Sequence, residues 1–179
     1  MNKRGQMVGM LYFIGALFLA LFVGFMMSVG TAFIDWTADT TLPELQNLGQ
    51  AGDVNLTEVS DLTITPLNSV VQAMPGIVGV MYVMMLVASL GMAYMFRAGG
   101  ERWLLFLFFG LSLLLVIASI GMSMIYEDFY DDDGELGDRL REQSLLSFLI
   151  LYSPAIMTVI SMAGAMIMFT GYEETGVGP

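Results

Sequence analysis

The residues most able to do chemistry form an acidic run near position 130. Four carboxylates surround Gly134: Asp131, Asp132, Asp133 and Glu135. Carboxylate oxygens grouped around a glycine are ligands that Ca²⁺ prefers, but the spacing does not fit an EF-hand. With Gly134 at the invariant glycine position, Phe129 is the first ligand and Leu140 replaces the bidentate Glu. The four acids are candidates for loose cation binding at the surface, and a solvated acidic loop is the default interpretation.

Other reactive side chains are scarce. The chain has no Cys and no His, which excludes thiol nucleophiles, disulfides, most zinc sites and the usual general base near neutral pH. Methionines are abundant, and thioethers bind Cu(I). The methionines considered are Met81, Met84, Met85, Met162, Met166 and Met168. Without Cys or His beside them, we interpret them as fillers of irregular gaps. The sequence predicts no catalytic residue, cofactor or metal site, and hence no enzyme.

Four long apolar segments dominate the chain, of which 56% is hydrophobic. They cover about residues 7–34, 76–96, 103–126 and 145–169. Each reaches the roughly 20 residues that span a bilayer. Inside hydrocarbon each backbone amide must be paired, which favours helices for uninterrupted apolar runs. The sequence predicts an all-α polytopic membrane protein, a single domain over 1–179 with four transmembrane helices in a bundle.

The charged flanks predict the orientation of the bundle. Four basic residues precede the first helix or bracket the turn between the second and third: Lys3, Arg4, Arg97 and Arg102. Basic residues favour the cytoplasmic side. Both termini are therefore expected in the cytoplasm, and residues 35–75 and 127–144 are expected to form extracytoplasmic loops.

Both expected outer loops are acidic. Residues 35–75 hold six acids and no basic residue, and residues 127–144 hold eight acids against Arg139 and Arg141. Asp138 is expected to cap the N-terminus of a short helix that contains these two arginines. With a net charge of -11, the chain is not expected to bind nucleic acid.

The middle of each apolar segment lacks Asp, Glu, Lys and Arg. Proton relays, voltage sensors and many ion-coupled carriers need ionisable groups at membrane depth. A pump or coupled transporter acting alone is therefore disfavoured. A passive pore formed by several copies, lined by Ser, Thr and backbone carbonyls and entered through an acidic outer vestibule, stays open.

Small residues recur at every fourth position of the first segment: Ala16, Ala20, Gly24, Ser28 and Ala32. This spacing predicts a groove in which another helix approaches closely. The partner is either a helix of the same bundle or a helix of another subunit. In the fourth segment Pro154 is expected to kink the helix, because proline frees a carbonyl one turn earlier. The kink either shapes the bundle or acts as a hinge.

The chain begins with a basic pair and a glycine before the first apolar run: Met1-Asn2-Lys3-Arg4-Gly5-Gln6-Met7. Over about the first 30 residues it resembles the class III leader of archaeal type IV pilin-like proteins. The resemblance implies cleavage between Gly5 and Gln6, retention of the apolar segment and behaviour as a filament subunit. The chain departs from that family by having three further apolar spans. The alternative to a processed leader is a positively charged end that holds the first helix with its N-terminus in the cytoplasm.

These features favour a non-enzymatic structural or accessory subunit that assembles by helix packing into a larger membrane complex. Its expected partners are membrane lipids and other membrane subunits or copies of itself. The alternatives are the homo-oligomeric passive channel and the pilin-like filament or surface-assembly subunit. A single Lys among six basic residues and Asp-rich loops suit a salt-adapted or archaeal cell. We expect a prokaryotic plasma membrane, and an archaeal one fits the composition. A viral membrane is the alternative.

Overall fold

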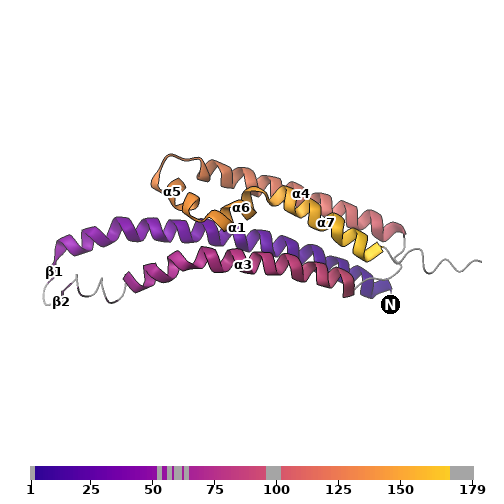
Figure 1. Ribbon diagram of the computed structural model, residues 1–179, viewed down its shortest axis with the longest axis horizontal. Helices are drawn as coiled ribbons and strands as arrows, with labels where there is room; N and C mark the ends of the chain where they lie inside the picture. Colours follow the sequence, from indigo (N-terminus) through magenta and orange to yellow (C-terminus); the bar gives the residue numbers. More distant parts are fainter. Residues whose placement is uncertain are drawn as a thin grey trace, which may run out of the picture.

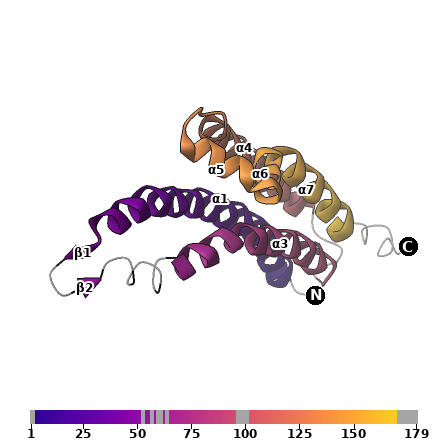
Figure 2. The same cartoon turned by 60° about the vertical axis from the view of Figure 1, so that its left-hand side comes forward.

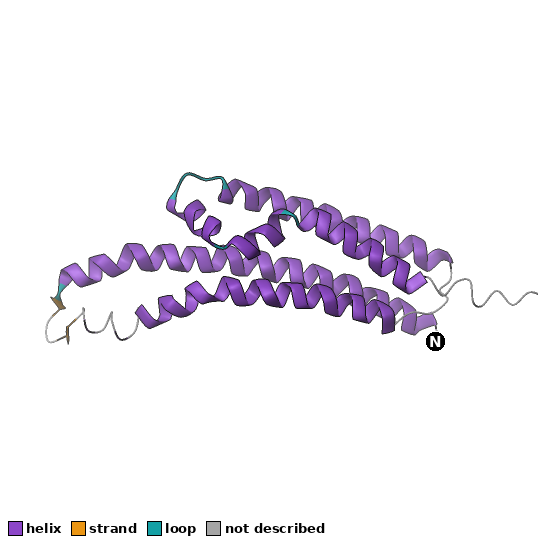
Figure 3. Cartoon of the chain, in the orientation of Figure 1, coloured by secondary structure: helices purple, strands orange, loops and turns teal. Residues whose placement is uncertain are grey.

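The computed structural model describes residues 3–51, 54–55, 58, 62, 65–95 and 102–169. Its helices are α1 (Lys3–Leu48), α3 (Thr65–Met95), α4 (Arg102–Tyr130), α5 (Glu135–Glu142), α6 (Ser144–Leu151) and α7 (Ser153–Phe169). The two-residue strands β1 (Gln50–Ala51) and β2 (Val54–Asn55) pair antiparallel. Apart from this pair, the regular structure of the described residues is helical (Figure 3), as predicted.

The long helices form two layers. In Figure 1, α1 and α3 lie side by side along the length of the molecule, and α4 and α7 form a second pair above them. The short helices α5 and α6 lie between α4 and the α1–α3 pair, and both contact α1. Figure 2 shows the layers from another side, with α1 extending well beyond α5. The far end of α1 therefore projects from the bundle.

Among the described residues, three helices, α1, α3 and α4, are long and apolar enough to cross a membrane. The pair α6 and α7 also qualifies if it counts as one broken span. Many large apolar side chains on these helices are exposed, as lipid-facing residues would be. These features are compatible with an integral membrane protein.

The helices continue beyond the predicted spans. At 1.5 Å per residue, the 46 residues of α1 extend about 69 Å, more than twice the roughly 30 Å of a hydrocarbon core. The predicted loop 35–75 is thus helical at both ends, because α1 ends only at Leu48 and α3 begins at Thr65. Gly49 follows α1 with φ 63°, the left-handed conformation that terminates helices. Hydropathy locates only the apolar part of such a helix, so it set the predicted end near residue 34 too early.

The second predicted loop, 127–144, is also partly helical. The helix α4 continues to Tyr130, and α5 occupies Glu135–Glu142. Arg97, the first two residues of the leader and residues 170–179 lie outside the described residues.

The stripe of small residues on α1 is buried within this chain. Ala20, Gly24, Ser28 and Ala32 are buried, and Ala16 is half-buried. A Cβ atom added to Gly24 would lie 2.8 Å from Cδ2 of Tyr82 on α3, so the tyrosine ring packs directly on the glycine backbone. The interpretation as a contact within the bundle therefore describes the structure, and the stripe is not a free surface for another subunit.

The fourth predicted helix is broken. A bend of 68° separates α6 from α7 at Tyr152. Pro154 lies in the first turn of α7, where its missing N–H leaves no hydrogen bond unmade. Hydroxyl groups of α4 and α7 bridge the break, because Ser123 Oγ donates to the Leu151 carbonyl at 2.7 Å and Ser153 Oγ donates to the Ser119 carbonyl at 3.4 Å.

We expect Gly24→Val to destabilise the folded protein by about 1–3 kcal/mol, because the added methyl groups push Tyr82 out of a packed interface. Thermal unfolding in detergent or lipid measures the effect. The matched control is Gly91→Val on α3, where an added Cβ meets nothing within 4 Å. Equal losses in the two variants would contradict the packing of Tyr82 on Gly24.

Candidate functional site

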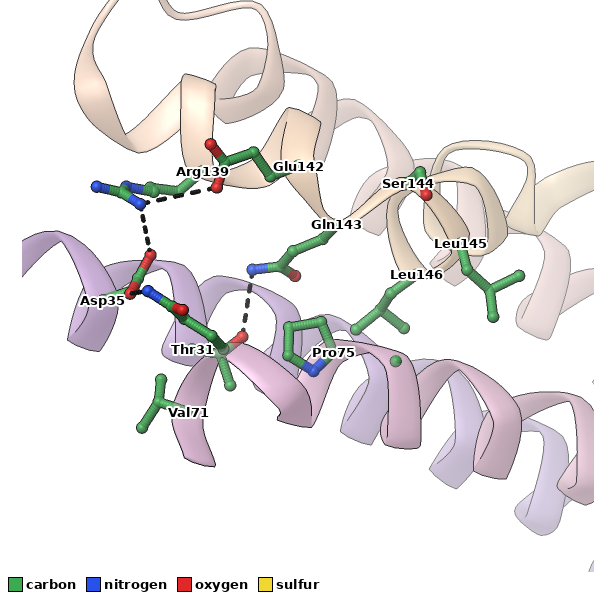
Figure 4. A pocket seen from close by; sticks show the side chains of 12 residues that line it. Thr31, Asp35, Val71, Pro75, Arg139, Glu142, Gln143, Ser144, Leu145 and Leu146 are labelled. Atoms are coloured by element: carbon green, nitrogen blue, oxygen red, sulfur yellow. Dashed lines mark hydrogen bonds and ion pairs between the residues drawn. The ribbon is translucent and has the colours of Figure 1, made fainter. Parts of the chain in front are cut away.

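A polar cavity of about 300 Å³ opens where α1, α3, α5 and α6 meet. Figure 4 shows its side chains converging from these helices. The polar residues that line it are Thr31, Asp35, Gln72, Arg139, Glu142, Gln143 and Ser144. Because charged side chains line a partly open cavity, we take it as the candidate functional site.

The helix α1 supplies one wall of the site. Ser28, Thr31, Asp35 and Asp39 follow one another at intervals of three or four residues, which places them on one face. Asp35 is only 7% exposed. Its Oδ2 atom lies 3.0 Å from Nη1 of Arg139, and its Oδ1 accepts a hydrogen bond of 3.1 Å from Nε2 of Gln72 on α3.

Arg139 connects α5 to α1. Besides Asp35, its guanidinium pairs with Asp39, and Nη1 lies 3.7 Å from the carboxylate of Glu142. Three carboxylates thus surround one guanidinium, which leaves the local charge negative. With Asp35 removed from water, this attraction is less screened than in an exposed ion pair.

Other contacts fix α5 in place. A helix of eight residues is not stable by itself. Leu140 is fully buried in an apolar cluster with Tyr126 and Ile150. A Cβ atom on Gly137 would lie 2.0 Å from the Asp132 carbonyl oxygen, so only glycine allows the preceding loop to approach this closely. The Arg139 guanidinium therefore reaches α1 from a helix, α5, that is itself well packed.

Gln143, between α5 and α6, makes a second connection to α1. Ser28 Oγ donates to Gln143 Oε1 at 2.7 Å, and Gln143 Nε2 donates to the Ser28 carbonyl at 3.2 Å and to Thr31 Oγ1 at 3.3 Å. The side-chain amide of Gln143 thus forms hydrogen bonds with both backbone and side-chain atoms of one turn of α1.

A chain of hydroxyls continues from this point into the bundle. The Tyr126 hydroxyl on α4 lies 2.7 Å from Ser28 Oγ and 2.8 Å from Ser147 Oγ. Ser147 Oγ donates to the Leu140 carbonyl at 2.6 Å, while Ser28 donates to Gln143. The single proton of Tyr126 can therefore serve only one of its two neighbours at a time. This network joins α1, α4, α5 and α6 without any strong acid or base.

The acidic run that the sequence singled out lies outside this cavity. Asp131, Asp132, Asp133 and Glu135 are exposed around the start of α5. In the described part of the chain, no three acids are grouped so that they could hold a metal ion. The methionines are also dispersed, since Met81 and Met84 on α3 and Met162 and Met166 on α7 are exposed and Met168 is buried.

The predicted cap at Asp138 is wrong. Gly134 precedes α5, and Asp138 lies within the helix, where it accepts a hydrogen bond of 2.7 Å from Nη2 of Arg141. This hydrogen bond raises the pKa of the Arg141 guanidinium above its ordinary value. The helix begins at Glu135 after Gly134, four residues earlier than a cap at Asp138 would place it.

The sequence reasoning missed the four residues that define the site: Asp35, Gln72, Arg139 and Gln143. One signal could have found part of it. Asp35 and Asp39 continue the helical spacing of Ser28 and Thr31, so they belong to the same buried face rather than to a loop. The arrangement can fasten α5 and α6 to α1 and can enclose a small polar group.

Comparison of the chain with protein-family models, with curated proteins and with solved structures finds no match. The function therefore has to be inferred from the geometry.

We expect Arg139→Gln to destabilise the docked position of α5 by about 1–3 kcal/mol, because it leaves Asp35 buried without a counter-charge. Hydrogen exchange of the α5 amides measures the effect. Arg141→Gln is the matched control, since Arg141 bonds only at the exposed surface, and it should change exchange little. Adding Asp35→Asn to Arg139→Gln should recover part of the protection; no recovery would contradict the buried ion pair.

Proposed function

We propose that the protein is a non-enzymatic integral membrane subunit that assembles by helix packing into a larger membrane complex. The observation that carries this proposal is the projecting α1–α3 pair. Figure 1 shows both helices extending past α5, α1 further than α3. Asp39 of α1 pairs with Arg139 of α5, so α1 projects beyond this residue up to Leu48. A bundle that only had to span a bilayer would not need this extension, whereas a subunit that contacts other proteins outside the lipid would use it.

The surface chemistry of this projection supports a protein partner. Leu67 and Val70 on α3 are more than half exposed, and they precede the uninterrupted apolar segment 76–96 of the sequence. Asp39 and Glu44 on the adjacent part of α1 are acidic, and no basic residue lies between 35 and 75. Exposed aliphatic side chains beside carboxylates suit a partner surface that is apolar with a basic rim.

The orientation follows from the charge distribution. The basic residues Lys3 and Arg4 begin α1, and positive residues favour the cytoplasmic side of a membrane. The N-terminus is then cytoplasmic, the projection is extracytoplasmic, and a chain with four crossings returns its C-terminus to the cytoplasm. The acidic, Lys-poor composition suits a prokaryotic plasma membrane, with an archaeal or a viral membrane as alternatives.

The intact particle in native lipid tests the proposal. We expect extraction with a lipid-preserving polymer to yield a particle in which this chain and other membrane proteins occur in fixed ratio, as measured by native mass spectrometry. Leu67→Asp should release the partners, because it places a charge in the contact. Thr41→Asp, an exposed change on the projecting part of α1, is the matched control. A particle that contains one copy of this chain and lipid alone would overturn the proposal.

The same measurement separates the alternatives. A closed ring of identical chains would favour the passive channel, which conductance in reconstituted bilayers would then test. A filament of identical chains that begin at Gln6 would favour the pilin-like subunit, because the leader resemblance implies cleavage after Gly5.

A further inference from the structure

The polar cavity between α1, α3, α5 and α6 offers more hydrogen-bond acceptors than free donors. Four side chains that line it and carry N–H or O–H groups already donate within the protein: Thr31, Gln72, Arg139 and Gln143. Its acceptors are not used up in the same way, because an ionised carboxylate offers about four acceptor positions. Asp35 and Glu142 both line the cavity. The space therefore suits a ligand that donates hydrogen bonds.

A backbone carbonyl adds to this excess of acceptors. Pro75 lies inside α3 and has no N–H, so the carbonyl of Val71, four residues earlier, lacks its usual helical donor. Val71 and Pro75 are both buried and both line the cavity, which places this carbonyl on the cavity side of α3. A buried carbonyl without a donor is unfavourable, and a ligand that donates a hydrogen bond to it removes this cost.

The charge around the cavity is also unbalanced. The carboxylates of Asp35, Asp39 and Glu142 surround the single guanidinium of Arg139, so two negative charges are in excess. Figure 4 shows Asp35 and Glu142 on two sides of this guanidinium. Within the residues that the structure describes, no three acids are grouped so that they could hold a metal ion. The arrangement favours an organic cation with several N–H donors.

We infer that the cavity binds the primary ammonium group of a small amine. Such a group carries one positive charge and three N–H donors, which match the Val71 carbonyl and the carboxylates of Asp35 and Glu142. The ammonium belongs either to a free amine or to the headgroup of an amine-bearing lipid. Because the apolar segment 76–96 begins at Gly76, which lines the cavity, the cavity would lie at headgroup level in a membrane. The inference concerns this chain alone and does not require the proposed assembly.

Open space beside Gly76 provides room for the amine. A Cβ atom added to Gly76 would meet nothing within 4 Å, although this residue lines the cavity. A longer side chain at this position would therefore fill the cavity and leave the charged groups of its lining unchanged. This makes Gly76 the position at which binding can be blocked without altering the charge of the protein.

The full chain, purified in detergent, tests the inference with ethylammonium chloride as the probe. Tetramethylammonium chloride is the matched salt, because its cation has the same charge but no N–H donor. We expect ethylammonium to raise the midpoint of thermal unfolding above that in tetramethylammonium at equal concentration, because a ligand that binds only the folded state stabilises it. Equal midpoints in the two salts would overturn the inference.

Two pairs of variants separate binding in the cavity from general attraction to an acidic protein. Gly76→Leu should abolish the difference between the salts, whereas Gly91→Leu, at another open position of α3, should preserve it. Glu142→Gln should weaken ethylammonium binding by roughly threefold, as expected for one partly exposed charge. Glu135→Gln makes the same change of charge on α5 outside the cavity and should not weaken it. A Gly76→Leu protein that still distinguishes the two salts would contradict binding in this cavity.

A second measurement identifies the source of the amine. Phosphatidylethanolamine and phosphatidylcholine are added in equal amounts to the purified chain, and native mass spectrometry measures which lipid is retained. Preference for phosphatidylethanolamine that is lost in Gly76→Leu would support the inference with a lipid headgroup as the source. No preference, together with stabilisation by ethylammonium, would support a free amine.

A partner protein is the remaining occupant that an experiment can reveal. Carbodiimide joins a carboxylate to a lysine amine that contacts it. A lysine of another protein cross-linked to Glu142 in native membranes would overturn the small amine as ligand and would support the proposed assembly. Loss of the amine site by the salt comparison would leave that assembly untouched, because the native particle tests it independently.

Discussion

The ion pair between Asp35 and Arg139 determines how the last third of the chain meets the first. Asp35 is buried on α1, so its charge requires a partner inside the protein. Arg139 supplies that partner from α5, which is too short to be stable alone. Once α5 lies against α1, Leu140 enters the apolar cluster and Gln143 reaches Ser28. The position of α6, and therefore the start of α7, follows from this contact.

The same requirement for paired polar groups explains the broken span. A bend of 68° interrupts the helical hydrogen-bond pattern between α6 and α7 and leaves carbonyls without their usual donors. Ser123 of α4 bonds one of them, that of Leu151, and the Ser119 carbonyl, one turn away on the same helix, receives the hydroxyl of Ser153. Hence the serine contacts with α4 support the bend alongside Pro154. Proline permits the break, and the serines make it stable in an apolar environment.

The sequence predicted the apolar spans because hydrophobic side chains mark them directly. It did not predict the full length of α1. The residues from Asp35 to Leu48 are helical but include many polar side chains, so hydropathy cannot distinguish them from a loop. Pro154 was correctly expected near a bend, but the break centres on Tyr152 because the neighbouring serines of α4 accommodate it there. The spacing of the small residues located the stripe on α1. It could not identify Tyr82 as the residue that packs on the stripe, because Tyr82 belongs to another helix.

The polar cavity was beyond sequence reasoning for a different reason. Asp35 and Arg139 are separated by about a hundred residues, and each resembles an ordinary loop charge in its own segment. Only the folded chain shows that Asp35 is buried and that Arg139 approaches it. Local patterns identify elements, whereas this pair depends on the packing of α5 between the two layers.

The internal use of the small-residue stripe limits how this protein can meet others. Because Tyr82 packs on Gly24 and the Tyr126 hydroxyl bonds Ser28, that face of α1 is already occupied inside the bundle. The surfaces left for the proposed partners include the exposed apolar sides of α1, α3, α4 and α7 and the far end of α1. These surfaces lie at different distances along the bundle axis (Figure 1). Contact of a proposed partner with the far end of α1 would therefore not obstruct contact along the apolar sides of the helices.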